Sequence, residues 1–133
     1  MSNETGFASR ALKVLVVEDN IINQRLAVAM LHSLGHTGVV VGDGEKALKC
    51  LAKLKFDVVL MDVMMPVMDG LETVASIRAR EQNEGGHQSI IMATSHAEPG
   101  DAARFKRAGA DGYVAKPLEE TSLRAEIHRV LRF

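Results

Sequence analysis

The sequence lacks the residues that crosslink a chain or anchor it in a membrane. Its 133 residues include one cysteine, no tryptophan and three prolines, and only 4% are aromatic. The single cysteine, Cys50, excludes an intrachain disulfide and fits a reducing compartment, so the fold has to rest on a packed apolar core. No apolar run approaches the roughly 18 residues of a membrane-spanning helix, so we expect no membrane contact.

The chain also lacks an excess of charge of either sign. Sixteen basic residues stand against 17 acidic ones, and the formal net charge is −1. Nucleic-acid binding by electrostatic attraction requires a basic patch, and it is therefore not expected. Residues 1–11 contain Glu4 and no hydrophobic segment, so they are predicted to be a flexible tail and not a secretory signal. Residues 12–133 are long enough for one domain with its own core, and we expect that domain to be cytoplasmic.

Short apolar runs alternate with helical stripes along the rest of the chain. A wholly apolar run of four or five residues is typical of a strand buried on both faces of a parallel sheet. The predicted strands are Lys13–Val17, Val39–Val41, Val58–Asp62, Ile90–Ala93 and Tyr113–Ala115. Five strands alternating with five helices predict an α/β fold, a parallel sheet covered by helices on both faces.

Several helix boundaries follow from local signals. The first helix has apolar residues four apart, widened by two more, and Gly35 should end it. This stripe consists of Ile22, Leu26, Met30 and Leu34, with Ala27 and Leu31 beside them. Asp101 is predicted to cap the fourth helix, and Thr121 or Ser122 the fifth. Residues 81–88 are polar and contain two glycines, which predicts a surface loop.

Polar residues follow four of the five predicted strands. These are Glu18 and Asp19 after the first strand, Asp62 at the third, Thr94 at the fourth and Lys116 at the fifth. Each has a structural explanation on its own, because such residues also occur in turns, helix starts and solvated loops. Ligands of open α/β sheets bind at the carboxyl ends of strands, and the joint pattern favours a functional site there.

The chemistry of this set points to a divalent cation and a phosphoryl group. Three carboxylates at one sheet edge cannot all stay ionised and unpaired without a large free-energy cost, and Mg²⁺ prefers such oxygen ligands. A hydroxyl from Thr94 and an ammonium from Lys116 suit a phosphoryl group, whose transfer depends mainly on positioning and electrostatics. Asp62 can itself be attacked and form an aspartyl phosphate.

Five segments resemble the receiver domain of two-component response regulators, and the resemblance spans about residues 12–132. The segments are VLVVEDN at 14–20, DGEKAL at 43–48, VVLMDVMMPVMDGLE at 58–72, IIMATS at 90–95 and AGADGYVAKP at 108–117. The sequence around Asp19 and Asp62 is most similar to that of receivers in hybrid sensor histidine kinases and phosphorelays. The resemblance implies a flavodoxin-like (βα)5 fold with strand order 2-1-3-4-5.

The same resemblance implies a role for each site residue. Asp62 would accept the phosphoryl group from a phosphohistidine. Asp19, Asp62 and the backbone carbonyl of Met64 would bind Mg²⁺ directly, and Glu18 would act through a metal-bound water. The partner would be a histidine kinase or a histidine phosphotransfer protein. The domain would be a signalling phosphoprotein that catalyses its own phosphorylation and slow dephosphorylation, not an enzyme with external turnover.

Further positions would form the switch. Thr94 would hydrogen-bond the phosphoryl group, Lys116 would pair with it, and Tyr113 would turn inward. The Lys116–Pro117 peptide bond would be cis. The face formed by the fourth helix, fifth strand and fifth helix would carry the output and a possible homodimer. Met64 and His96 would flank the path of attacking water, and the apolar Met64 predicts slow dephosphorylation.

Three other functions fit the sequence less well. An aspartyl phosphohydrolase generally carries a second Asp two residues after the nucleophile, where this chain has Met64. A degenerate receiver that serves only as a docking module would be expected to lose an acidic residue, Thr94 or Lys116, and all are present. Dinucleotide binding would require a glycine-rich turn after the first strand, where Glu18 and Asp19 stand instead.

Overall fold

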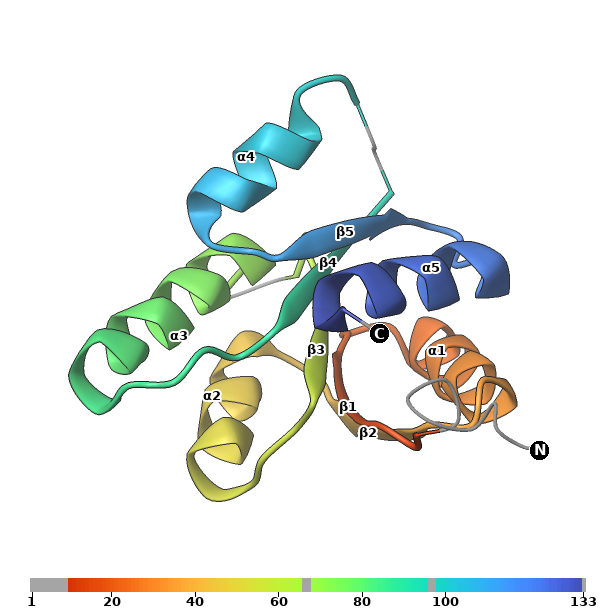
Figure 1. Cartoon of the computed structure of the whole chain (residues 1–133), viewed down its shortest axis with the longest axis horizontal. Coiled ribbons are helices and arrows are strands. Elements are labelled where there is room, and N and C mark those ends of the chain that lie inside the picture. Colours follow the sequence, from red (N-terminus) through yellow and green to blue (C-terminus); the bar gives the residue numbers. More distant parts are fainter. Residues whose placement is uncertain (1–9, 66–67, 96–97, 133) are drawn as a thin grey trace.

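Strands and helices alternate throughout a computed structural model that describes residues 10–65, 68–95 and 98–132 (Figure 1). The strands are β1 (Lys13–Val17), β2 (Thr37–Val41), β3 (Val58–Asp62), β4 (Ile90–Thr94) and β5 (Gly112–Ala115). The helices are α1 (Ile21–Ser33), α2 (Gly44–Lys53), α3 (Gly70–Glu84), α4 (Asp101–Ala108) and α5 (Glu120–Leu131). Among these described residues, no helix is long and apolar enough to cross a membrane.

The strands form one parallel sheet in the order β2-β1-β3-β4-β5, which confirms the predicted flavodoxin-like fold. The three central strands explain the continuous apolar runs in the sequence. Every residue of β3 and β4 is buried, and in β1 only Lys13 is exposed. The two edge strands, β2 and β5, are less deeply buried.

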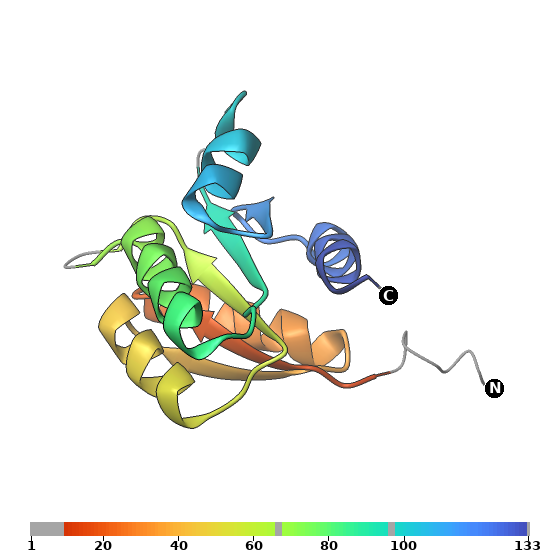
Figure 2. The same ribbon diagram turned by 60° about the vertical axis from the view of Figure 1, so that its left-hand side comes forward.

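Helices cover both faces of the sheet (Figures 1 and 2). One apolar cluster joins the sheet to α2, α3 and α4, with Ile77 and Phe105 fully buried in it. The other cluster joins the sheet to α1 and α5, with Leu31 and Ile127 at its centre. Cys50 packs against the first cluster, in agreement with its position in an apolar stripe. Both layers hold the carboxyl ends of the strands in fixed register.

The apolar stripe of α1 does not pack as its spacing predicts. Ala27 and Leu31 are the buried residues of this helix, whereas Ile22 is 66% exposed and Leu26 55% exposed. Apolar residues cover more than one side of α1, and the sheet can bury only one side. The remaining side, which also includes Ile21, forms an exposed apolar surface. Gly35 follows the helix with a positive φ of 90°, as expected for a residue that ends it.

Three predicted boundaries are wrong for local reasons. Helix α3 continues to Glu84, so the first half of the predicted loop at 81–88 is helical, and Glu81 there pairs with Arg78 one turn earlier. Asp101 is the first residue of α4 and not its cap, because its carboxylate accepts from the backbone N–H of Glu98. The cap position of α5 belongs to Glu119, so both Thr121 and Ser122 lie inside the helix.

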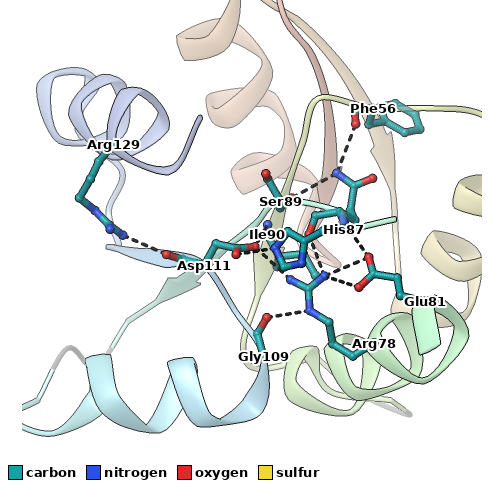
Figure 3. A network of polar contacts seen from close by, with 10 residues as sticks. Phe56, Arg78, Glu81, His87, Ser89, Ile90, Gly109, Asp111 and Arg129 are labelled. Atoms are coloured by element: carbon teal, nitrogen blue, oxygen red, sulfur yellow. Dashed lines mark hydrogen bonds and ion pairs between the residues drawn. The ribbon is translucent and has the colours of Figure 1, made fainter. Parts of the chain in front are cut away.

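A polar cluster centred on Arg78 lies at the amino ends of β4 and β5 (Figure 3). The Arg78 guanidinium donates to the carbonyl of Gly109 at 2.8 Å and pairs with Glu81 at 2.8 Å and Asp111 at 3.0 Å. Asp111 in turn accepts from the backbone N–H of Ile90 and donates its own N–H back to the Ile90 carbonyl. The cluster thus joins α3, β4 and the segment between α4 and β5.

Side chains of α5 cover part of the exposed edge of β5. Glu126 Oε2 accepts from the backbone N–H of Tyr113 at 2.8 Å, and Arg129 donates to the carbonyl of Asp111 at 3.0 Å. Arg129 also pairs with Glu126 at 2.8 Å. A Cβ on Gly112 would displace the ends of the Glu126 and Arg129 side chains from these positions. The strand edge therefore has backbone groups that are already bonded within the domain.

His36 is buried where α1 leads into β2, and its Nδ1 accepts from the backbone N–H of Leu12 at 3.1 Å. Burial lowers the pKa of His36 below its ordinary value, and the charge of His128 adds to this against the opposing charge of Asp57. As the pH falls, a histidine in the unfolded chain takes up a proton near pH 6.5, whereas His36 in the folded chain takes it up only at a lower pH. The free energy of unfolding should therefore fall as the pH drops below about 6.5 towards the lowered pKa.

Urea unfolding at pH 7.5 and at pH 5.5 measures this loss. In the variant His36→Asn, the amide oxygen can replace Nδ1 as the acceptor for Leu12 but does not titrate. We expect the variant to lose less stability between these two pH values than the parent chain does, since other titrating groups are common to both. Equal losses would contradict the assignment of the pH dependence to His36.

Candidate functional site

Parallel pairing gathers the predicted polar residues at one edge of the sheet. Val17 pairs with Met61, and Asp62 pairs with Ala93, so the residues that follow β1 and end β3 and β4 lie at the same level. The fifth strand adds Lys116, whose backbone N–H donates to the carbonyl of Thr94 at 2.7 Å. Residues that are far apart in sequence thus meet because their strands end together.

Lys116 lies between two buried carboxylates. Its Nζ is 2.8 Å from Oε1 of Glu18 and 3.0 Å from Oδ1 of Asp62. The side chains of both acidic residues are less than 10% exposed, and that of Lys116 is 15% exposed. Lys116, which follows β5, therefore links the carboxyl ends of β1 and β3 through its ammonium group.

The pKa values of the two carboxylates that share Lys116 shift in opposite directions. Burial raises the pKa of Asp62, the Lys116 hydrogen bond opposes this, and the negative charge of Glu18 adds to the rise. Burial acts in the same direction on Glu18, but hydrogen bonds from Lys116 and the Asn20 backbone lower its pKa overall. Burial disfavours the charged Lys116, but hydrogen bonds to the two carboxylates outweigh it and raise its pKa. Because two carboxylates share one ammonium, one negative charge is left uncompensated when both are ionised.

A third carboxylate increases this excess and completes a set of cation ligands. One carboxylate oxygen from each of Glu18, Asp19 and Asp62 lies within 4.8 Å of the others. Two of these residues are buried and Asp19 is exposed, so the cluster opens to solvent on one side. Hard oxygen donors and a surplus of negative charge fit Mg²⁺, which takes one or two carboxylates and retains several waters. The residues present therefore suit such an ion.

The loop after β3 fixes the position of Asp62. The N–H of Gly70 donates to the carbonyl of Val63 at 3.0 Å, and the N–H of Met64 lies 3.4 Å from Oδ1 of Asp62. A Cβ on Gly70 would overlap the carbonyl oxygen of Asp62, so only glycine allows this close approach. Asp69 begins α3 in a capping box with Glu72, which fixes the end of the loop. The side chain of Met64 is 71% exposed beside the carboxylate.

The predicted switch residues lie on the next two strands. Thr94 is buried at the end of β4, one residue from the limit of the described segment. Tyr113 is half-buried in β5, with its ring edge-on to Phe105 at a centroid distance of 5.7 Å. The Lys116–Pro117 bond is cis, as expected. His96, predicted to flank the water path, lies outside the described residues.

An apolar cavity of about 400 Å³ adjoins the carboxylates. Glu18, Asp62 and Lys116 line one end of it. Leu26 of α1 and Leu118 after β5 line its apolar part. The exposed apolar side of α1 therefore continues into the acidic cluster. Sequence reasoning missed this surface, although the unusual breadth of the apolar stripe on α1 was a usable signal.

Sequence reasoning also missed two polar residues that hold Glu18. The N–H of Asn20 donates to the Glu18 carboxylate at 3.1 Å, and the side-chain amide of Gln24 donates to the Glu18 carbonyl at 2.7 Å. Their spacing of four residues at the start of a helix is the only sign of this arrangement in the sequence.

Fold and site together define an α/β domain with an acidic, cation-suited pocket at the carboxyl edge of its sheet. The family model of the response regulator receiver domain matches residues 14–128. The chain belongs to this family, and it is a receiver domain of two-component signalling.

Two curated relatives are histidine kinases. Hybrid signal transduction histidine kinase I of Dictyostelium discoideum is 43% identical over 111 residues, which cover 80% of this chain and 6% of that protein. Sensor histidine kinase GacS of Pseudomonas protegens is 36% identical over 121 residues, which cover 90% of this chain and 13% of that protein. The chain thus spans a small part of these relatives, in agreement with its resemblance to hybrid-kinase receivers.

Solved structures show the same fold. The receiver domain of sensor histidine kinase PA1611 from Pseudomonas aeruginosa has a TM-score of 0.80 and 35% identity, covering 93% of this chain and all of that one. That structure has a magnesium ion coordinated in its active site cleft. Chemotaxis protein CheY4 of Vibrio cholerae also has a TM-score of 0.80, with 33% identity over 91% of this chain and 99% of that one.

Proposed function

We propose that Asp62 accepts a phosphoryl group from a phosphohistidine and that the phosphorylated domain changes its binding surface. The observation that carries this proposal is the Lys116 ammonium, which contacts both Asp62 and Glu18 while negative charge remains in excess. In this proposal Asp19, Asp62 and the Met64 carbonyl hold Mg²⁺, and Glu18 acts through a water. The ion supplies charge stabilisation to the oxygens of the transferred group.

The chain's own groups orient the transfer. A carboxylate oxygen of Asp62 attacks phosphorus and forms a P–O bond, while the P–N bond to the donor histidine breaks. The electron pair of that bond returns to the imidazole nitrogen, so the donor becomes a free histidine after proton uptake. Lys116 donates hydrogen bonds to the incoming phosphoryl oxygens, and Thr94 donates its hydroxyl.

Phosphorylation then changes the balance of contacts in the pocket. The aspartyl phosphate adds oxygens that interact with Thr94 and Lys116 more strongly than the carboxylate does. Movement at Thr94 reaches Tyr113 on the neighbouring strand, which turns inward. A cavity of about 740 Å³ between α4, β5 and α5 includes Tyr113 and Phe105 in its lining, so this rotation alters the proposed output and homodimer face. The apolar, exposed Met64 orients no water, which supports slow dephosphorylation.

The donor would approach along α1. Ile21, Ile22 and Leu26 are each more than half exposed, and the cavity lined by Leu26 leads directly to Asp62. A donor histidine on a helix has to bring its ring to the carboxylate while its flanking side chains contact a neighbouring surface. The apolar side of α1 supplies that surface, so a histidine kinase or histidine phosphotransfer protein would dock there. A histidine kinase takes its phosphoryl group from ATP, and a phosphotransfer protein receives it from another phosphoprotein of the relay, so the cytoplasm is the proposed location of this step.

Labelling with two kinds of donor tests this function. Acetyl phosphate and a phosphorylated histidine phosphotransfer protein should both label the chain, and chelation of Mg²⁺ should stop both reactions. Transfer to the variant Leu26→Gln should slow about tenfold or more with the protein donor, since burial of a leucine is worth roughly 1.5–3 kcal/mol. Labelling of this variant by acetyl phosphate should not change.

Leu54 provides the matched control, because it is 46% exposed at the end of α2 and does not line the cavity beside Asp62. The variant Leu54→Gln should behave as the parent chain does with both donors. Labelling that is independent of Mg²⁺ would contradict the proposed ion, and continuous hydrolysis of phosphate esters would indicate a phosphohydrolase. Equal transfer rates for both leucine variants would remove the docking surface from the proposal.

A further inference from the structure

The peptide between Glu18 and Asp19 determines how two of the three carboxylates enter the acidic cluster. Its carbonyl belongs to Glu18 and lies just beyond β1, where ladder pairing with the neighbouring strands ends. The side-chain amide of Gln24 donates to this carbonyl at 2.7 Å. Gln24 is half-buried in the second turn of α1, so a helix side chain holds the backbone of the site.

Each other polar group of Glu18 is also held by a different element. Its N–H donates to the Val41 carbonyl of β2 at 3.1 Å, and its carboxylate accepts from Asn20 and Lys116. Because both the N–H and the carbonyl of Glu18 are bonded, neither peptide plane next to its Cα can rotate freely. The contact from Val41 fixes one plane, and the contact from Gln24 fixes the other.

The start of α1 determines where Gln24 lies relative to the acidic cluster. Asn20 caps the helix, because its side chain accepts from the N–H of Asn23 at 3.0 Å. The carbonyl of Asn20 accepts from the N–H of Gln24 at 2.9 Å. Gln24 therefore stands one turn above the cap, and its amide reaches back to the residue before Asp19.

We infer that Gln24 is a positioning residue for the cation site, which it preorganises by fixing the Glu18–Asp19 peptide. The inference rests on the proposed function, since it concerns the same Mg²⁺ site. The orientation of the Glu18–Asp19 peptide helps to set the direction in which the exposed Asp19 side chain leaves the backbone. Residues that orient metal ligands through hydrogen bonds typically change metal affinity by 10–100-fold when they are replaced.

The variants Gln24→Leu and Gln24→Glu separate positioning from charge. Neither side chain donates a hydrogen bond at neutral pH, and leucine and glutamate have similar sizes. We expect the Mg²⁺ dissociation constant of the unphosphorylated chain to rise about tenfold in both variants. If Gln24 acted only through local charge, the added carboxylate of Gln24→Glu would instead strengthen Mg²⁺ binding.

Isothermal titration with Mg²⁺ alone measures these affinities, and thermal unfolding in a chelator measures stability without the metal. Ala29→Leu, an exposed change on the same helix, is the control and should bind as the parent chain does. Parent-like affinity in both Gln24 variants would overturn the inference and leave the proposed function intact. A parent chain that binds no Mg²⁺ would overturn the metal site itself.

Discussion

Replacing Asp62 with asparagine is expected to reduce labelling by acetyl phosphate to background. The amide has nearly the shape of the carboxylate, but its oxygen is a far weaker nucleophile and cannot form a stable acyl phosphate. The substitution also removes one of the negative charges that surround Lys116, which then pairs with Glu18 alone. Incorporation of radioactive phosphate, measured at equal protein and Mg²⁺ concentrations, gives the result directly.

Loss of labelling in this variant should not reflect unfolding. The pKa of Asp62 is raised in the folded state by burial and by the charge of Glu18. A carboxyl group with a raised pKa destabilises the fold when it is ionised, so its replacement by a neutral amide should keep or increase stability at pH 7. Thermal unfolding of parent and variant checks this point. Full labelling of a folded variant would show that another residue is the acceptor.

Replacing Arg78 with methionine is expected to lower the free energy of unfolding by about 3 kcal/mol. Methionine retains much of the apolar volume but donates to none of the partners that Arg78 holds (Figure 3). Glu81 and Asp111, with side chains 16% and 24% exposed, would lose the guanidinium that compensates them. The carbonyl of Gly109 would also lose its donor. Urea unfolding measures the difference.

The control for this prediction is an arginine with no role in the cluster. Arg107 is exposed on α4, and Arg107→Met should change the free energy of unfolding little. The Arg78 cluster lies at the amino ends of the strands, and Asp62 lies at their carboxyl ends. Under conditions where Arg78→Met is folded, it should therefore retain labelling. A loss below about 1 kcal/mol, typical of exposed ion pairs, would show that the cluster acts as a surface network.

The strands were predictable because a strand that is buried on both faces has a continuous apolar sequence. Strands β3 and β4 are apolar almost throughout, and both were located to within a residue. The pocket was predictable for a related reason, since parallel strands bring their carboxyl ends together and four of the five ends carried a candidate polar residue. The strand order came from the resemblance to receiver domains, because alternation of strands and helices is compatible with several orders.

Other features depend on contacts that local sequence does not encode. Leu26 and Leu31 are both apolar residues of α1, and only packing against the sheet decides which of them is buried. Arg78 and Asp111 are 33 residues apart and look like surface residues in the sequence, yet they join at the base of β5. Glu81 lies in α3 and its carboxylate pairs with Arg78, although its polar sequence neighbours predicted a loop.

The covering of β5 by α5 has a consequence for self-association. An open edge strand can recruit a strand from another molecule through its backbone, and such growth has no natural limit. Here Glu126 and Arg129 occupy backbone groups that an incoming strand would need. Two copies that meet at this face would therefore contact each other through helix side chains and not by joining their strands into one continuous sheet.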